Sequence, residues 1–292
     1  MDVKTLYTEF YWYYIKTRLK PNTQRGYRVN IEKHYLPFVG ELELYDINYH
    51  TLDNVTDQLL DKGLSARSVV YVHATARKMF AFAVRRGYLM VSPYDAYDLP
   101  RVPEYHHKTV TMTEIRAAVK AAEGTVMYAP LVLAAMYGLR RGEVLGLKPS
   151  DFDPASSTLY IQRTRNTVDG QDVVTDCKTK HSRRYVLIAP EHSPIFSASA
   201  SISDEYVVNI SSEMLDKRWS RFRAMLPKPF HKLRFHDLRH SYATAMMLAR
   251  VNPKIVSEAL GHSGIGITLD LYSHPDVSMQ QQLLDVITEK RT

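Results

Sequence analysis

Residues 236–250 read HDLRHSYATAMMLAR and place two kinds of side chain at helical spacing. The apolar members recur with the period of an α-helix and form one stripe, made of Leu238, Tyr242, Ala245, Met246 and Ala249. His236, Arg239 and His240 are three and four positions apart and share another side of the same helix. We expect the stripe to pack against a core, and the polar side to offer two imidazoles and a guanidinium. Taken alone, such a polar side is more typical of a solvated helix than of a site.

A second candidate group lies in YGLRRGEVLGLKPSDFD, residues 137–153, where Arg140 follows an apolar stretch and a glycine. The planar guanidinium fits two phosphate oxygens and stays charged when it is partly desolvated, so two arginines can hold a phosphodiester from two sides. The alternative is an Arg140–Glu143 pair within one helix, a common contact that contributes about 0.2–0.5 kcal/mol.

The segment DCKTKHSRRYVLIAP, residues 176–190, carries Lys178 near an expected turn between two strands. A lysine on a hairpin can reach into a groove and deliver a proton to a leaving oxygen. Charged turns also simply keep hairpins soluble. Lys180, Arg183 and Arg184 are therefore either contacts to a phosphate backbone or solvated charges.

The segment LGHSGIGITLDLYSH, residues 260–274, follows an expected short helix that begins at Pro253. Gly261 suits the end of that helix and places His262 in the next turn, whereas Tyr272 is expected on the helix that follows. A phenol with a pKa of about 10 is a poor nucleophile. Beside two arginines and a phosphate its ionisation is favoured, and attack at phosphorus becomes possible. The alternative is a tyrosine that only packs.

The first hundred residues show amphipathic helical patterns, which predict an all-helical module. Pro21 is expected to end the first helix, with Asn22 or Thr23 capping the second, Gly63 ending the third and Ser65 capping the longest. The expected helices cover residues 5–20, 23–38, 51–63 and 65–89. The proline-containing stretch that follows is typical of a connector between domains.

The remainder of the chain mixes helical patterns with short alternating runs. Helices are expected over residues 112–124, 128–147 and 211–226, the second of them buried. The runs STLYIQRTRNTV, GQDVVTDCKT and RRYVLIAP, within residues 157–190, predict a small antiparallel sheet of about three strands.

The composition bounds the class of protein. The 292 residues are 45% hydrophobic and 24% charged, which is typical of a soluble globular chain. No apolar run is long enough for a membrane span, and MDVKTLYTEF lacks the features of a secretory signal, so we expect a cytoplasmic protein. The net charge of +7 weakly favours a polyanionic partner. With one cysteine, neither an intramolecular disulfide nor a CxxC site is expected, and no carboxylate or histidine cluster has metal-binding spacing.

In their order along the chain, 137–153, 176–190, 236–250 and 260–274, the four blocks resemble the active-site blocks of the tyrosine recombinase (phage integrase) family, and the resemblance extends over essentially the whole chain. It implies a mainly α fold with a small antiparallel β-sheet in the second domain, arranged as a two-domain C-shaped DNA clamp. Residues 1–100 would be a helical, SAM-like core-binding domain, 101–110 a linker, and 111–292 the catalytic domain with a C-terminal tail. Many members carry an arm-binding domain ahead of these, which we do not expect here.

The resemblance also implies the roles of single residues. The arginines that clamp the phosphate would be Arg140 and Arg239, and the hairpin lysine would be Lys178. The two histidine positions would be His236 and His262. The nucleophile would be Tyr272. Glu143 is expected to have an orienting or structural role and to take no part in the chemistry.

The implied activity is site-specific recombination of double-stranded DNA. A tyrosine would attack the scissile phosphate and form a 3′-phosphotyrosyl link with a free 5′-hydroxyl, with no metal, ATP or other cofactor. The implied partners are a DNA recombination site, on which the enzyme works as a homo-tetramer, and neither a membrane nor a small-molecule substrate. The tail beyond Tyr272 either docks on a neighbouring protomer or folds back on its own domain.

Three other functions remain as alternatives. A type IB topoisomerase-like relaxing enzyme would use the same residues, a non-catalytic DNA-binding regulator would keep the fold alone, and a metal-dependent nuclease is the least favoured.

Overall fold

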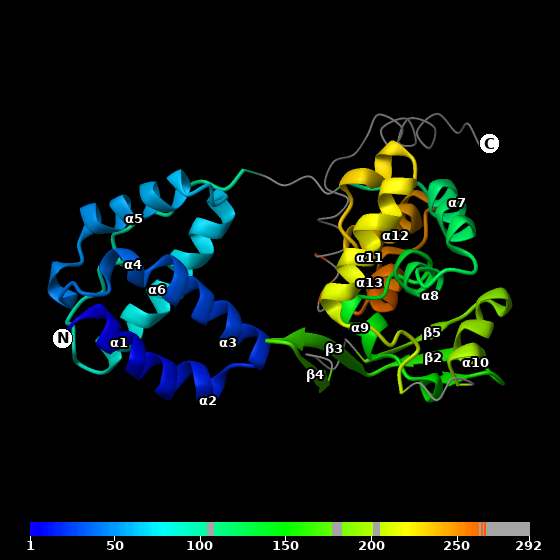
Figure 1. The fold of residues 1–292 in the computed structure, drawn as a ribbon, viewed down its shortest axis with the longest axis horizontal. Helices are drawn as coiled ribbons and strands as arrows, with labels where there is room; N and C mark the ends of the chain where they lie inside the picture. The colour runs from blue at the N-terminus through cyan, green and yellow to red at the C-terminus, as the bar shows by residue number, and fades with distance from the viewer. Residues whose placement is uncertain (104–107, 177–182, 201–204, 263, 265, 267–292) are drawn as a thin grey trace. The chain divides into compact units, whose positions relative to one another are not determined.

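The computed structural model describes residues 1–103, 108–176, 183–200, 205–262, 264 and 266. The chain divides into two compact units, Met1–Tyr105 and His106–Thr292 (Figure 1). This division falls inside the stretch 101–110 that the sequence marks as a connector.

In the described residues of the first unit, every regular element is helical. The α-helices are α1 (Val3–Phe10), α2 (Lys16–Arg18), α3 (Pro21–Arg28), α4 (Leu36–Val39), α5 (Tyr49–Asp61) and α6 (Ala66–Arg85). Two π-helical segments, η1 (Tyr11–Ile15) and η2 (Val29–Lys33), and a 3₁₀ turn, η3 (Leu44–Asp46), connect them. Their apolar faces enclose one core that includes Phe10, Tyr35 and Phe80.

The ends of these helices follow the local chemistry, with one correction. Ser65 caps α6 by accepting the N–H of Ser68, as expected, and Gly63 has a positive φ of 81° after α5. The expectation that Asn22 or Thr23 caps the second helix is wrong. Pro21 is itself the first residue of α3, where its missing N–H costs nothing because that group has no partner within the helix.

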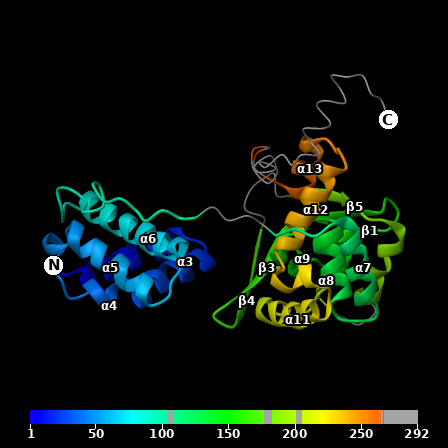
Figure 2. The same ribbon diagram turned by 90° about the horizontal axis from the view of Figure 1, so that it is seen from above.

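The second unit combines helices with short strands. Its α-helices are α7 (Met112–Ala122), α8 (Tyr128–Leu131), α9 (Arg141–Gly146), α10 (Pro194–Ala200), α11 (Ser212–Met225), α12 (Asp237–Leu248) and α13 (Pro253–Leu260). A π-helical segment, η4 (Val132–Met136), and the 3₁₀ turns η5 (Pro149–Asp151), η7 (Pro190–His192) and η8 (Lys228–Lys232) complete the helical elements. The strands are β1 (Phe152–Asp153), β2 (Thr158–Ile161), β3 (Arg163–Val168), β4 (Gln171–Asp176) and β5 (Arg184–Leu187). Helices α12 and α13 lie side by side (Figures 1 and 2).

The strands form two antiparallel sheets and not the single sheet that the sequence predicted. One sheet has the order β1-β2-β5, and β3 pairs with β4 through a turn at Asp169 and Gly170. The run STLYIQRTRNTV therefore splits at Gln162. The side-chain amide of Gln162 donates a hydrogen bond to Asp151 at 2.8 Å, and the guanidinium of Arg163 donates to the same carboxylate at 2.5 Å. These two bonds anchor the chain between the two sheets.

The apolar stretch 128–147 also differs from the prediction of one continuous helix. Its helical part ends at Met136, and Gly138 adopts a φ of +67° before α9 begins at Arg141. The stretch is buried as expected. Because of the break, Arg140 lies outside the helical segments, at the position just before α9. An added Cβ at Gly138 would lie 2.7 Å from carbons of both Leu260 and Tyr242, so only glycine fits.

The variant Gly138→Ala is expected to lower the free energy of unfolding by about 2–5 kcal/mol. A left-handed conformation costs a residue with a Cβ about 1–2 kcal/mol, and forced overpacking adds about 1–3 kcal/mol. The measurement is urea-induced unfolding. Gly124→Ala is the matched control, because Gly124 has a φ of +72° with nothing within 4 Å of its Cβ position, and it should show only the backbone cost. Equal effects of the two variants would contradict a tight contact at Gly138.

The core of the second unit lies between the helices and the β1-β2-β5 sheet, and it includes Leu133, Leu159, Trp219 and Leu238. Within the described ranges, no helix has the length and apolar character needed to cross a membrane.

Candidate active site

Arg140 occupies the position just before α9, in an extended conformation, and Glu143 lies one turn later. One carboxylate oxygen of Glu143 accepts the backbone N–H of Arg140 at 2.9 Å, and the other accepts its guanidinium at 2.7 Å. The Arg140–Glu143 pair that the sequence left as an alternative does form. It is not a surface pair, however, because the Glu143 side chain is 1% exposed.

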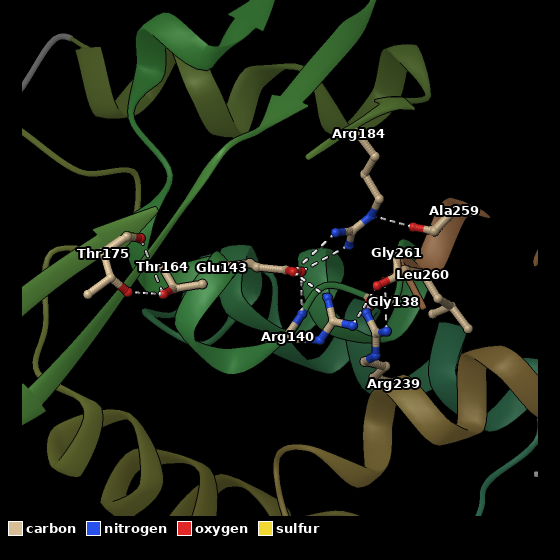
Figure 3. A network of polar contacts seen from close by, with 10 residues as sticks. All are labelled: Gly138, Arg140, Glu143, Thr164, Thr175, Arg184, Arg239, Ala259, Leu260 and Gly261. Carbon is tan, nitrogen blue, oxygen red and sulfur yellow. Dashed lines mark hydrogen bonds and ion pairs between the residues drawn. The ribbon is translucent and has the colours of Figure 1, made fainter. Parts of the chain in front are cut away.

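A second arginine approaches Glu143 from the strand β5. The two terminal nitrogens of Arg184 donate to the two oxygens of Glu143 at 3.1 and 2.9 Å, so the carboxylate bridges Arg184 and Arg140 (Figure 3). Burial raises the pKa of Glu143, but the hydrogen bonds of Arg184 and the charges of both arginines outweigh it and lower the pKa to about 2. Glu143 is therefore ionised at neutral pH and fixed between two cations.

Arg239 lies in the first turn of α12 and is 3% exposed. Its terminal nitrogens donate to the carbonyls of Gly138 at 2.6 Å and Leu260 at 2.7 Å. The polar side of HDLRHSYATAMMLAR is thus buried at Arg239 and at Asp237, because α12 packs on more than its apolar stripe. Burial, and after it the charge of Arg140, lowers the pKa of Arg239 to about 9, which leaves the guanidinium protonated at neutral pH.

The last turn of α13 brings these arginines together. Three consecutive carbonyls, those of Ala259, Leu260 and Gly261, accept hydrogen bonds from Arg184, Arg239 and Arg140 in that order (Figure 3). The final carbonyls of a helix lack partners within the helix and carry its partial negative charge, so cations are favoured there. Side chains from β5, α12 and α9 are consequently fixed around one helix end.

The two candidate histidines flank the same region. His236 precedes α12, and His262 follows Gly261, whose left-handed conformation (φ 65°) ends α13 as the sequence predicted. The backbone N–H of His262 donates to the carbonyl of Ser257 at 3.0 Å. Burial, followed by the charge of Arg239, lowers the pKa of each imidazole to about 4. Both imidazoles are therefore neutral at pH 7 and able to donate or accept a hydrogen bond.

Four of the six expected site residues can be placed. Arg140, Arg239 and His262 meet at the end of α13, and burial, followed by the charges of Arg239 and then Arg140, lowers the pKa of His236. Lys178, with its expected hairpin turn, and Tyr272, with the tail beyond it, lie outside the described residues.

Arg184 is one of three residues, with Lys180 and Arg183, whose role the sequence left open between a phosphate contact and a solvated charge. The structure excludes a solvated charge for Arg184, since its side chain is 6% exposed and bound to Glu143. A signal was present in RRYVLIAP, where Arg184 alternates in phase with Val186 and Ile188, the inward positions of the strand. Arg183 has the opposite phase and is half exposed.

The charges at this site favour an anion. Among the described residues, the guanidinium groups of Arg140 and Arg184 share the carboxylate of Glu143, that of Arg239 binds two backbone carbonyls, and the neighbouring imidazoles are uncharged at neutral pH. Buried positive charge in excess of its counter-charge is stabilised by an anionic ligand, and the arginine forks suit a phosphate. Within the residues placed by the structure, no group of three or more histidine, cysteine, aspartate or glutamate side chains could hold a metal ion.

Comparison with known families places the chain in a known class of enzyme. Residues 108–279, more than half of the chain, match the phage integrase family, and residues 3–60 match the phage integrase N-terminal SAM-like domain. The chain belongs to the phage integrase family. As a member it is a tyrosine recombinase, an enzyme that transfers DNA strands in site-specific recombination.

Curated relatives of this family member include recombinases and integrases of bacteria. It is 29% identical over 288 residues to a XerC-like tyrosine recombinase of Caldanaerobacter subterraneus, covering 84% of this chain and 73% of the relative. It is 25% identical over 296 residues to the ICEBs1 integrase of Bacillus subtilis, covering 92% and 78%. These names do not support the topoisomerase-like enzyme or the non-catalytic regulator.

Solved structures of integrases share the fold. The Tn1549 transposon integrase in complex with transposon right end DNA matches with a TM-score of 0.81 at 18% identity, over 99% of this chain and 100% of that one. A lambda integrase tetramer bound to a Holliday junction matches with a TM-score of 0.70 at 17% identity, over 93% and 77%. The mainly helical fold with small antiparallel sheets is therefore confirmed.

Proposed function

We propose that this phage integrase family member recombines DNA with Tyr272 as its nucleophile and with Arg140, Arg239, His236 and His262 as the groups that hold the scissile phosphate. The observation that carries this assignment is the convergence of Arg140 and Arg239 on successive carbonyls directly before His262. Two side chains that are 99 positions apart in the sequence thus bind the same helix end. The sequence places Tyr272 ten residues beyond His262.

In the proposed reaction, the phenolic oxygen of Tyr272 attacks phosphorus and forms a 3′-phosphotyrosyl ester. The bond from phosphorus to the 5′-oxygen breaks, and Lys178 donates the proton that the leaving oxygen needs. A 5′-hydroxyl of the partner duplex then attacks the ester and releases the tyrosine. Because the ester conserves the energy of the phosphodiester bond, the chemistry requires neither ATP nor a metal.

The arginines act on the charge that develops in the transition state. Negative charge accumulates on the nonbridging oxygens as phosphorus becomes pentavalent, and pre-positioned donors stabilise it without reorganising. The Arg140 side chain is 32% exposed and can direct hydrogen-bond donors toward a ligand. Arg239 is buried and is fixed by its hydrogen bonds to the carbonyls of Gly138 and Leu260. The neutral imidazoles of His236 and His262 can add hydrogen bonds, and His236 can accept the tyrosine proton.

Double-stranded DNA is the proposed partner of both units. The first unit would act as the core-binding domain, with the residues after it as a linker, and each unit would contact the duplex. Most of the affinity would come from phosphate contacts and would fall steeply with salt. The lambda integrase structure on a Holliday junction is a tetramer, and we propose the same assembly here, in the cytoplasm on the nucleoid. Of the two alternatives for the tail, docking on a neighbouring protomer belongs to this assembly.

Capture of a covalent complex tests this function and identifies the DNA site in the same experiment. Wild-type protein is incubated in EDTA with a library of nicked duplexes of randomised sequence, in which the cleaved strand loses a short fragment and cannot be religated. Adducts that survive SDS are isolated, their DNA is sequenced, and the attached peptide is identified by mass spectrometry. We expect a recurring DNA sequence joined to Tyr272. Failure to form any adduct, or attachment through another residue, would contradict the proposal.

The variant Lys178→Ala is expected to slow cleavage of a recovered duplex by about 100-fold while leaving its binding affinity unchanged, since general acid catalysis contributes about 10²–10⁴-fold. The measurement is the single-turnover rate at saturating DNA. The control is a duplex with sulfur in place of the bridging 5′-oxygen, because a thiolate leaves without protonation. Lys178→Ala should cleave this duplex as fast as the wild-type protein does. Equal slowing on both substrates would rule out Lys178 as the general acid.

A further inference from the structure

Arg184 differs from the other two arginines because all its nitrogens are committed inside the protein. The two terminal nitrogens bind the two oxygens of Glu143, and Nε donates to the carbonyl of Ala259 at 2.5 Å. Burial does not distinguish Arg184 from Arg239, which are 7% and 3% exposed; the difference lies in Nε, which binds the Ala259 carbonyl in Arg184, whereas among the described residues Arg239 donates through its two terminal nitrogens. This geometry is unsuited to holding a phosphate and suited to holding other residues.

The contacts of Arg184 connect two parts of the site that are distant in sequence. Through Glu143 it reaches Arg140 at the start of α9, and through Ala259 it reaches the last turn of α13. That turn also receives Arg239 and Arg140 and leads directly into His262. Displacing Arg184 would therefore disturb both the position of Arg140 and the helix end that carries His262.

Arg184 also affects the charge available to a ligand. Alone with Arg140, the buried carboxylate of Glu143 would form a neutral pair and draw the Arg140 guanidinium inward. With Arg184 present, the carboxylate is shared between two cations, and the positive charge of Arg140 is only partly compensated. A guanidinium so placed keeps its attraction for a phosphate.

We propose that Arg184 is a positioning residue for strand cleavage, which sets the place of Arg140 through Glu143 and the place of the α13 end through Ala259. This role rests on the proposed function, since it presumes that Arg140 and His262 hold the scissile phosphate. A lysine cannot replace it, because one ammonium cannot span both oxygens of Glu143 and the carbonyl of Ala259.

The test compares Arg184→Gln and Arg184→Lys with Arg183→Gln. The control removes the same charge from the adjacent residue, which is half exposed and pairs with Asp176 at the surface. Single-turnover adduct formation is measured at saturating concentrations of a duplex recovered by the wild-type protein. A misplacement of about 1 Å at a reacting centre costs about 100-fold, so we expect that loss in both Arg184 variants and less than a twofold change in Arg183→Gln. Affinity for the duplex should change little in all three.

A second measurement separates positioning from folding and needs no DNA. In Arg184→Gln, the amide of His262 should exchange with solvent at least tenfold faster than in the wild type, whereas Arg183→Gln should leave it unchanged. The double variant Glu143→Gln/Arg184→Gln removes the unbalanced buried charge and should regain thermal stability without regaining the cleavage rate. Recovery of both would show that Arg184 serves only the fold.

The outcomes distinguish this proposal from the proposed function. A wild-type protein that forms no adduct contradicts the proposed function, and the amide exchange then decides whether Arg184 positions the α13 end. Wild-type rates in both Arg184 variants, or an unchanged His262 amide in Arg184→Gln, would overturn the role of Arg184 alone.

Discussion

Replacing Tyr272 with phenylalanine is expected to abolish the covalent protein–DNA complex completely. The variant lacks the single oxygen that would form the phosphotyrosyl ester, and no other group on the residue can accept the phosphorus. Charge is unchanged, so the affinity for DNA should remain at the wild-type level. The measurement is the yield of SDS-stable adduct on a nicked duplex recovered by the wild-type protein, together with the binding affinity for the same duplex.

Tyr185→Phe is the matched control for this loss. Tyr185 lies on β5 in the same unit, is 69% exposed and stacks on Tyr160 at 4.6 Å between ring centroids. Removing its hydroxyl should leave the adduct yield unchanged. Persistence of the adduct in Tyr272→Phe would assign the nucleophile to another residue and would remove the central step of the proposed mechanism.

Replacing Arg239 with lysine is expected to slow adduct formation by about 100–1000-fold, which corresponds to about 3–4 kcal/mol of transition-state stabilisation. The guanidinium spans the carbonyls of Gly138 and Leu260 and can direct its remaining N–H toward a phosphate. A lysine ammonium keeps the charge but cannot reproduce this planar geometry. The single-turnover rate at saturating DNA measures the loss.

Arg141→Lys is the matched control, because it makes the same arginine-to-lysine substitution at the residue next to Arg140. Arg141 is partly exposed and pairs with Asp216, so its replacement should leave the rate within a factor of two. The salt dependence of binding should be the same for both variants, since the number of positive charges is unchanged. A rate for Arg239→Lys close to the wild-type rate would show that charge alone is needed and that the arginine geometry is not.

Much of the helical architecture was predictable because its signals are local. Ser65 and Gly63 marked helix ends through hydrogen-bonding and conformational preferences that depend on a few neighbouring residues. The same holds for Gly261, whose left-handed conformation places His262 just beyond α13. Pro21 was misread because a proline is compatible with both the end of one helix and the first turn of the next.

The pairing of the strands was not predictable from the alternating pattern. The pattern identified extended segments but not their partners, and the split at Gln162 depends on Asp151, eleven residues away in the sequence. The break at Gly138 was likewise hidden, since its cause is the close approach of Leu260 and Tyr242 from other helices.

The sequence by itself determined the family, the order of the site residues and the identity of the nucleophile that we propose, because these depend on residue types in a fixed order. Only the tertiary structure decided that Arg239 is buried and that Arg184 joins Glu143 to the end of α13. Burial and charge pairing arise between segments that are distant in the chain, and the free energy of a buried ion depends on every group around it. No local pattern carries that information.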